Sequence, residues 1–115
     1  MKTVVLIPAY KPELRMLDVI AELSAYEFDL VVVDDGSGDG YRTLFDEASK
    51  SAVVLRHEVN RGKGAALKTG IGYIDRHYQK PYVIVTADAD GQHRTEDIVK
   101  VSRVAADHPD SLVLG

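Results

Sequence analysis

Two aspartates closely follow an apolar stretch in the last third of the chain. The stretch, residues 82–86, reads Tyr-Val-Ile-Val-Thr and predicts a strand that is buried on both faces. Asp88 and Asp90 come just after its carboxyl end, and Gln92 continues the same alternation. Because residues two apart in an extended chain point the same way, these three side chains can reach one point. Such a set of oxygen ligands suits Mg²⁺ or Mn²⁺.

The same three residues also fit a simpler interpretation. Asp and Gly commonly form turns after strands in α/β proteins, and one Asp-x-Asp motif has little specificity. The chain contains no cysteine, which disfavours a site for a soft metal. The metal site is therefore a hypothesis that needs support from other parts of the chain.

Alternating strands and helices are expected to position these residues. Short apolar runs predict strands at residues 4–7, 30–33, 53–55, 82–86 and 112–114. Apolar residues at helical spacing predict four helices between them. Their buried positions are expected at Met16, Ile20 and Leu23; at Tyr41, Leu44, Phe45 and Ala48; at Leu67, Ile71, Ile74 and Tyr78; and at Ile98, Val101 and Ala105. Pro12 is expected in the first turn of the first helix, and Thr95 is expected to cap the fourth.

This alternation predicts a single α/β domain over residues 1–115. Its expected architecture has three layers, α/β/α, with a mainly parallel sheet. Right-handed crossovers bring the carboxyl ends of all strands to one edge of the sheet. Open sheets of this kind bind ligands outside that edge.

Four loops at this edge carry groups that a nucleotide needs. Tyr10 can stack on a base, and Asp34 and Asp35 can accept hydrogen bonds from a base or a ribose. Lys63 lies between two glycines at the start of a helix, where it can approach a phosphate. Each residue has an ordinary alternative, such as ring packing, turn formation or helix capping. Their common place at one edge favours nucleotide binding.

Four sequence blocks occur in a fixed order along almost the whole chain. They are Val-Leu-Ile-Pro-Ala-Tyr at residues 5–10, Val-Val-Val-Asp-Asp-Gly-Ser at 31–37, Asn-Arg-Gly-Lys-Gly-Ala-Ala-Leu at 60–67, and Asp-Ala-Asp-Gly-Gln-His at 88–93. Together they resemble the amino-terminal half of glycosyltransferase family 2, nearest to its dolichyl- or polyprenyl-phosphate sugar synthases. The resemblance implies a GT-A fold, a nucleotide-diphospho-sugar donor such as a UDP- or GDP-sugar, and inverting transfer assisted by Mg²⁺ or Mn²⁺.

The resemblance also implies a role for individual positions. The nucleotide is expected to be bound by Pro8, Ala9, Tyr10, Glu13, Asp34, Asp35, Lys63, Asp88 and Ala89. The metal is expected at Asp88, Asp90 and Gln92. Residues 11–13 read Lys-Pro-Glu where the family usually has Asn-Glu-Glu, so Glu13 can equally be a solvated residue at a helix start.

Family members continue with a further segment that completes the sheet and the acceptor side. The catalytic base, which is not assigned here, is expected in that segment. The chain is therefore expected to be a truncated donor half, incomplete at its carboxyl end, that cannot complete the transfer. An incomplete sheet exposes an edge strand, so a homo-oligomer is also expected.

Composition limits the classes of binding partner and indicates the cellular compartment. A net charge of −4 without a long basic run disfavours nucleic acid. No apolar run approaches the roughly 18 residues that would span a bilayer. The lack of cysteine and of a leader-like start fits a cytoplasmic protein, at the inner face of the membrane when full-length. The expected acceptor is a lipid phosphate or a glycan of the cell envelope.

Two other functional classes remain open. A sugar nucleotidyltransferase would need a glycine-rich, basic loop after the first strand, and Pro-Ala-Tyr-Lys-Pro at residues 8–12 is not such a loop. A non-catalytic nucleotide-binding or oligomerising module would use the same four loops. Only the presence of Asp88, Asp90 and Gln92 favours an enzyme over that module.

Overall fold

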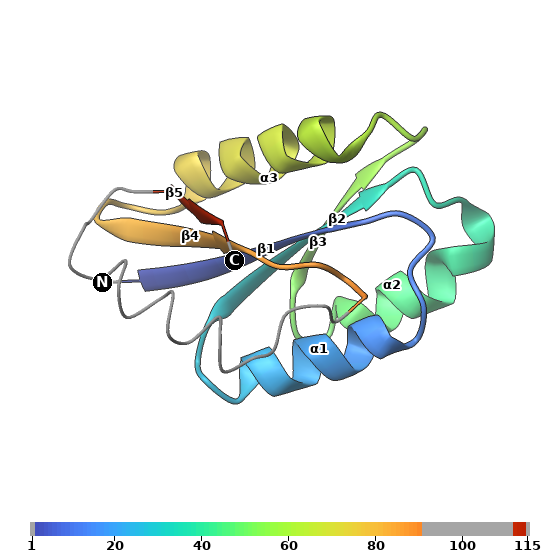
Figure 1. Ribbon diagram of the computed structural model, residues 1–115, viewed down its shortest axis with the longest axis horizontal. Helices are drawn as coiled ribbons and strands as arrows, with labels where there is room; N and C mark the ends of the chain where they lie inside the picture. The colour runs from blue at the N-terminus through green and yellow to red at the C-terminus, as the bar shows by residue number, and fades with distance from the viewer. Residues whose placement is uncertain (1, 91–111, 115) are drawn as a thin grey trace.

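The structure is a computed structural model that describes residues 2–90 and 112–114. Strands and helices alternate along the chain, with a short 3₁₀ helix, η1, before the second α-helix (Figure 1). In chain order the elements are β1 (Lys2–Ala9), α1 (Arg15–Ser24), β2 (Asp29–Asp35), η1 (Asp39–Tyr41), α2 (Arg42–Ala48), β3 (Val53–His57), α3 (Lys63–His77), β4 (Tyr82–Thr86) and β5 (Leu112–Leu114).

The five strands form one parallel sheet in the order β3-β2-β1-β4-β5. The central strand β1 pairs with β2 from Val4 opposite Asp29 to Ala9 opposite Asp34, and with β4 on its other side. The predicted parallel sheet is confirmed. The loops that leave the carboxyl ends of β1, β2, β3 and β4 therefore lie along one edge.

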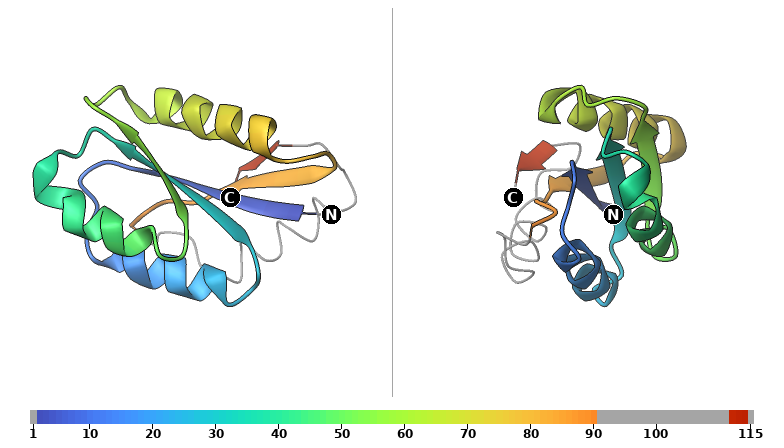
Figure 2. Two further views of the ribbon diagram at one scale, coloured as in Figure 1. Left: turned by 180° about the vertical axis from the view of Figure 1, so that it is seen from behind. Right: turned by 90° about the vertical axis from the view of Figure 1, so that its right-hand side faces the viewer.

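Helices cover both faces of the sheet, as predicted (Figure 2). Helices α1 and α2 pack on one face, where Met16, Ile20 and Phe45 join strand residues in one core. Helix α3 packs on the other face, where Ala66 and Ile74 join a second core. Strand residues alternate between these two cores, which explains why the strands read as continuous apolar runs.

The buried stripe of α3 agrees with the predicted one at Ile74 but differs at the other positions. Its fully buried positions are Ala66, Gly70 and Ile74, whereas Leu67, Ile71 and Tyr78 are only partly buried at its flanks. The cause is a close approach to β1: a Cβ atom at Gly70 would lie 2.2 Å from Cδ1 of Leu6. Small residues let α3 lie this close to the sheet, and an apolar periodicity search overlooks them.

Two further predictions concern helix ends. Helix α1 begins at Arg15, so Pro12 lies before the helix and not in its first turn. The predicted fourth helix, with Thr95, lies outside the described residues. Across residues 2–90 and 112–114, no helix has the length and apolar character needed to cross a membrane.

Candidate functional site

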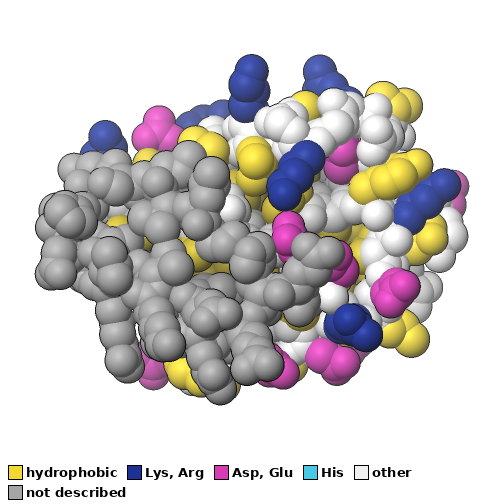
Figure 3. Space-filling view, viewed as in Figure 1, with side chains coloured by type: hydrophobic (Ala, Val, Ile, Leu, Met, Phe, Trp, Pro, Cys, Tyr) yellow, Lys and Arg dark blue, Asp and Glu magenta, His cyan; other side chains and the backbone are white. Residues whose placement is uncertain are grey.

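Two adjoining cavities open at the carboxyl edge of the sheet. Their volumes are about 640 Å³ and 290 Å³. Both are lined by Pro8, Ala9, Tyr10, Lys63 and Asp88, which come from the end of β1 and the loop after it, from the loop after β4 and from the start of α3. Acidic and basic side chains lie side by side in the middle of the face seen in Figure 3.

Most of the predicted nucleotide positions line the larger cavity. They are Pro8, Ala9, Tyr10, Glu13, Lys63, Asp88 and Ala89. Asp90 also lines the larger cavity, and Asp35 lines the smaller one. Asp34 lines neither of the two, and Gln92 lies outside the described residues.

The loop after β1 turns sharply and presents Tyr10 at the cavity mouth. Lys11 has a left-handed backbone conformation with φ of 47°, and its N–H donates a hydrogen bond to Ser37 Oγ at 2.8 Å. This bond ties the loop after β1 to the loop after β2. Tyr10 remains half-exposed, and the Lys11 ammonium lies over its ring, 5.4 Å from the centroid.

The segment after β4 stays alongside β1 for one more residue. The N–H of Ala87 donates to the carbonyl of Leu6 at 3.0 Å, and the Ala87 side chain is buried. Asp88 follows at the cavity wall, where Lys63 Nζ lies 3.4 Å from its Oδ1. The continued pairing therefore delivers the first carboxylate of the predicted metal set to the cavity.

Asp88 and Asp90 have the oxygen ligands that a hard divalent cation prefers, but two carboxylates are too few to form a complete metal site. Both carboxylates line the larger cavity, and oxygen is the donor that Mg²⁺ and Mn²⁺ prefer. Within residues 2–90 and 112–114, no cluster of three or more Asp, Glu, His or Cys side chains forms a metal site. Arg15 also reaches this loop, where its Nη1 donates to the Asp90 carbonyl at 3.4 Å.

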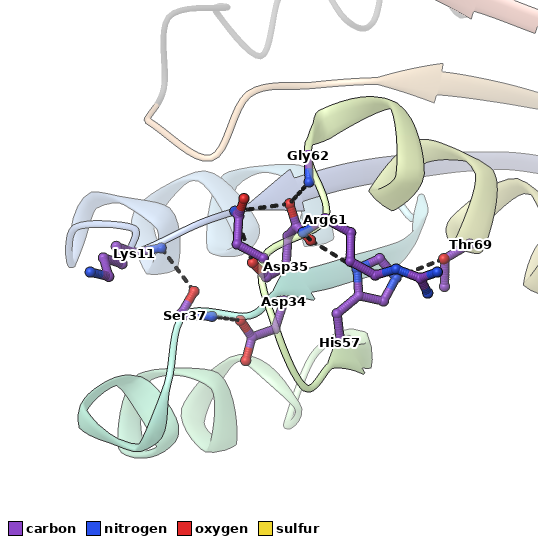
Figure 4. Close-up of polar contacts among 9 residues, drawn as sticks. Lys11, Asp34, Asp35, Ser37, His57, Arg61, Gly62 and Thr69 are labelled. Carbon is purple, nitrogen blue, oxygen red and sulfur yellow. Dashed lines mark hydrogen bonds and ion pairs between the residues drawn. The ribbon is translucent and has the colours of Figure 1, made fainter.

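Asp34 is buried and shapes the turn that follows β2. Its Oδ1 accepts a hydrogen bond from the N–H of Ser37 at 3.0 Å (Figure 4). The contact corresponds to turn formation, which the sequence analysis gave as the alternative to nucleotide binding by this residue. Binding of a ribose or base by Asp34 stays a prediction.

Asp35 is buried against the loop between β3 and α3. It accepts hydrogen bonds from the N–H groups of Arg61 and Gly62, each at 2.9 Å, and from Asn60 Nδ2 at 3.2 Å. Its Oδ1 also lies 2.8 Å from Nδ1 of His57 (Figure 4). Burial favours the neutral acid, but these hydrogen bonds outweigh it and hold the pKa of Asp35 below its ordinary value.

Sequence reasoning gave no individual role to His57, which contacts Asp35, or to Asn60, which it included only in the block at residues 60–67. His57 is the last residue of β3 and lies opposite Asp35 in the parallel register, while Asn60 lines the smaller cavity. One signal was available, because both residues fall at the carboxyl edge. The register that places His57 beside Asp35 depends on tertiary packing and leaves no mark in the local sequence.

Comparison with known proteins identifies the family to which this chain is similar. The pattern of Glycosyl transferase family 2 matches residues 4–115. An uncharacterized protein of Methanocaldococcus jannaschii is 40% identical over 84% of this chain and 39% of its own length. The UDP-N-acetylglucosamine–dolichyl-phosphate N-acetylglucosaminyltransferase of Methanococcus voltae is 32% identical over 96% of this chain and 49% of its own length.

A bacterial relative extends this set. The polyprenol monophosphomannose synthase of Mycolicibacterium smegmatis is 32% identical over 87% of this chain and 39% of its own length. The chain thus spans about half or less of the curated relatives it matches. No solved structure is significantly similar to it. The three-layer parallel sheet agrees with the GT-A fold, and the match over residues 4–115 shows that the chain belongs to glycosyltransferase family 2.

Proposed function

We propose that this chain forms the donor-binding part of an enzyme that transfers a sugar from a nucleotide-diphospho-sugar to a polyprenyl phosphate. The observation that carries the proposal is the pair of adjoining cavities at the carboxyl edge. The residues that line the larger one include an aromatic ring, the Lys63 ammonium and the carboxylates of Asp88 and Asp90, which come from three separate segments. The names of the archaeal and bacterial relatives specify a dolichyl-phosphate and a polyprenol acceptor, which supports a lipid phosphate here.

The cavity residues divide into those for the nucleoside and those for the diphosphate. Tyr10 stacks on the base at the cavity mouth, and the smaller cavity beside it takes the rest of the nucleoside. Lys63, at the first position of α3, faces the phosphates together with the N–H groups of the helix start. With the nucleoside and the phosphates bound in this way, the sugar–phosphate bond that is cleaved would lie near Asp88 and Asp90.

Charge develops on the departing phosphate oxygens as the sugar leaves. Lys63 stabilises that charge directly. Asp88 and Asp90, with Gln92, would hold Mg²⁺ or Mn²⁺, which supplies further charge stabilisation when bound. The acceptor phosphate attacks from the opposite face of the sugar and inverts its configuration. A phosphate oxygen is already an anion, so this attack hardly needs a general base.

A lipid acceptor also sets where the reaction takes place. A polyprenyl chain stays in the bilayer, so transfer to its phosphate occurs at a membrane surface. We propose the cytoplasmic face, because the absence of cysteine from the sequence fits that compartment.

Calorimetric titration with UDP and with GDP, each with and without Mn²⁺, tests the donor site. We expect one nucleotide to bind and Mn²⁺ to strengthen its binding. Asp90→Ala should weaken the Mn²⁺-dependent binding by about tenfold or more, since even residues around metal ligands have effects of that size. Asp46→Ala removes the same charge from an exposed position on α2 and should behave like the unmodified chain.

Two outcomes would contradict the proposal. One is a folded protein that binds neither nucleotide. The other is equal Mn²⁺-dependent binding by the unmodified chain and by Asp90→Ala, which would remove Asp90 from the metal site.

A further inference from the structure

The carboxylate of Asp35 is the centre of a hydrogen-bond cluster that joins two loops. Oδ1 accepts from Arg61 N at 2.9 Å and lies 2.8 Å from His57 Nδ1. Oδ2 accepts from Gly62 N at 2.9 Å and from Asn60 Nδ2 at 3.2 Å. An ionised carboxylate offers about four lone-pair positions, so these four contacts use its whole capacity. The protein therefore holds Asp35 firmly in place at the wall of the smaller cavity.

Gly36 brings the backbones of the same two loops together. A Cβ atom at this position would lie 2.1 Å from the nitrogen of Asn60 and 2.2 Å from the carbonyl carbon of Val59. Its φ of 73° is also a conformation that other residues rarely adopt. The loop after β2 therefore fixes the loop after β3 by direct backbone contact as well as through Asp35.

His57 connects this cluster to the middle of α3. Its Nε2 lies 2.7 Å from Oγ1 of Thr69 (Figure 4). The ionised Asp35 carboxylate can only accept, so Nδ1 of His57 carries a proton. In the neutral ring Nε2 is then an acceptor, and the Thr69 hydroxyl donates to it. The chain of contacts runs from β2 through β3 to α3.

We propose that Asp35, His57 and Thr69 form a positioning clamp that holds residues 60–63 in place at the nucleotide cavities. Asn60, Gly62 and Lys63 line the smaller cavity, and Asp35 bonds to the first two of them. The clamp sets where Lys63 meets the phosphates. This inference rests on the proposed function, and it assigns Asp35 an effect on nucleotide affinity that acts through the loop.

Thr69→Val gives the sharpest test, because Thr69 lines neither cavity and valine has nearly the same shape. Two quantities are measured: hydrogen exchange at the Arg61 and Gly62 amides without ligand, and nucleotide affinity with Mn²⁺. Loss of one hydrogen bond should change each by about fivefold. His57→Leu should have a larger effect, whereas His57→Asn keeps a donor near Nδ1 and should restore part of the affinity.

Tyr82→Phe is the matched control. It removes a side-chain hydrogen bond to Asp75 at the opposite end of α3, at 3.0 Å. We expect it to leave the exchange of the Arg61 and Gly62 amides and the nucleotide affinity unchanged. A general loss of stability would affect control and test variants alike, so this comparison separates positioning from stability.

The outcomes distinguish the clamp from the proposed function. If the unmodified chain binds no nucleotide, the proposed function fails, and amide exchange alone decides whether the clamp holds the loop. Unchanged exchange at Arg61 and Gly62 in folded Thr69→Val would overturn the clamp. Altered exchange with unaltered affinity would overturn its role in nucleotide binding. If His57→Leu does not fold, Thr69→Val still decides.

Discussion

Asp35 is buried and yet more acidic than an ordinary aspartate. Burial by itself raises the pKa, while hydrogen bonds from His57, Arg61 and Gly62 favour the ionised form and lower the pKa overall. Because the folded-state pKa lies below the unfolded value, folding favours loss of the proton. The stabilisation is fully present above the unfolded pKa of about 3.9, and it is lost as the pH falls through the lower folded pKa.

Asp35→Asn should therefore change how stability depends on pH. We expect a lower free energy of unfolding near neutral pH and a flatter loss of stability below about pH 5, because the variant has no carboxylate to protonate. Urea denaturation across this pH range measures both effects. Asp46→Asn, at an exposed position on α2, should keep the slope of the unmodified chain. Parallel profiles for Asp35→Asn and the unmodified chain would contradict the expectation.

Sequence reasoning predicted the same role for Asp34 and Asp35, but the two residues have different hydrogen-bond partners in the structure. Asp34 bonds to Ser37 within its own turn, whereas Asp35 bonds to a loop more than 20 residues away. Residue type and spacing correctly placed both at the carboxyl edge. They could not tell which carboxylate the next strand's loop would reach, since that depends on the β2–β3 register.

At the scale of elements, the position of α3 depends on the absence of a side chain at Gly70. Gly70 allows the helix to approach Leu6, whose side chain is completely buried in β1. The first residue of this helix is Lys63. A displaced α3 would carry Lys63 and the wall of both cavities with it. The close packing at Gly70 thus contributes to the site from a distance.

Two glycine substitutions in α3 should have opposite effects on stability. Gly70→Ala places a methyl group on Leu6 and should cost about 1–3 kcal/mol, partly offset by the better helix propensity of alanine. Gly72→Ala meets only Arg76 Nη1 at 3.5 Å, and it should gain about 0.5–1 kcal/mol. Chemical denaturation of both variants measures the difference. A stabilised Gly70→Ala would show that the helix can move away from β1 at little cost.

Most elements were predictable because each carries a local signal. The strands β1, β2, β3 and β4 appear as apolar runs, and the buried positions of α1 follow helical spacing. Of the deep stripe of α3, only Ile74 was predicted, because glycine and alanine carry little apolar signal, although they decide how near two elements lie. The local sequence thus predicts whether a segment is a helix or a strand. The distance between two packed elements depends on the side chains of both.

At the scale of the whole molecule, the carboxyl edge of the sheet forms the candidate site, whereas the amino edge contributes to stability. The carboxyl edge carries the cavities. At the amino edge, Asp29 accepts a hydrogen bond from the Tyr78 hydroxyl at 2.6 Å and pairs with Lys2 at 3.0 Å. Burial and the neighbouring Asp29 carboxylate both raise the pKa of Tyr78, which keeps its hydroxyl protonated as the donor. This cluster fastens the end of α3 to β1 and β2.

Substitutions at the two edges should therefore separate stability from binding. Tyr78→Phe removes one hydrogen bond to a carboxylate and should cost about 1–2 kcal/mol, which lowers the melting temperature by several degrees. Its melting temperature should still rise normally on addition of nucleotide and Mn²⁺, since a ligand at 100 times its Kd adds about 2.7 kcal/mol to any folded, competent site. Asp90→Ala should show the reverse: a nearly unchanged melting temperature without ligand and a reduced rise with it. Thermal unfolding of both variants with and without ligand measures the four values. A Tyr78→Phe protein that loses the ligand-induced rise would show that the two edges are coupled through α3.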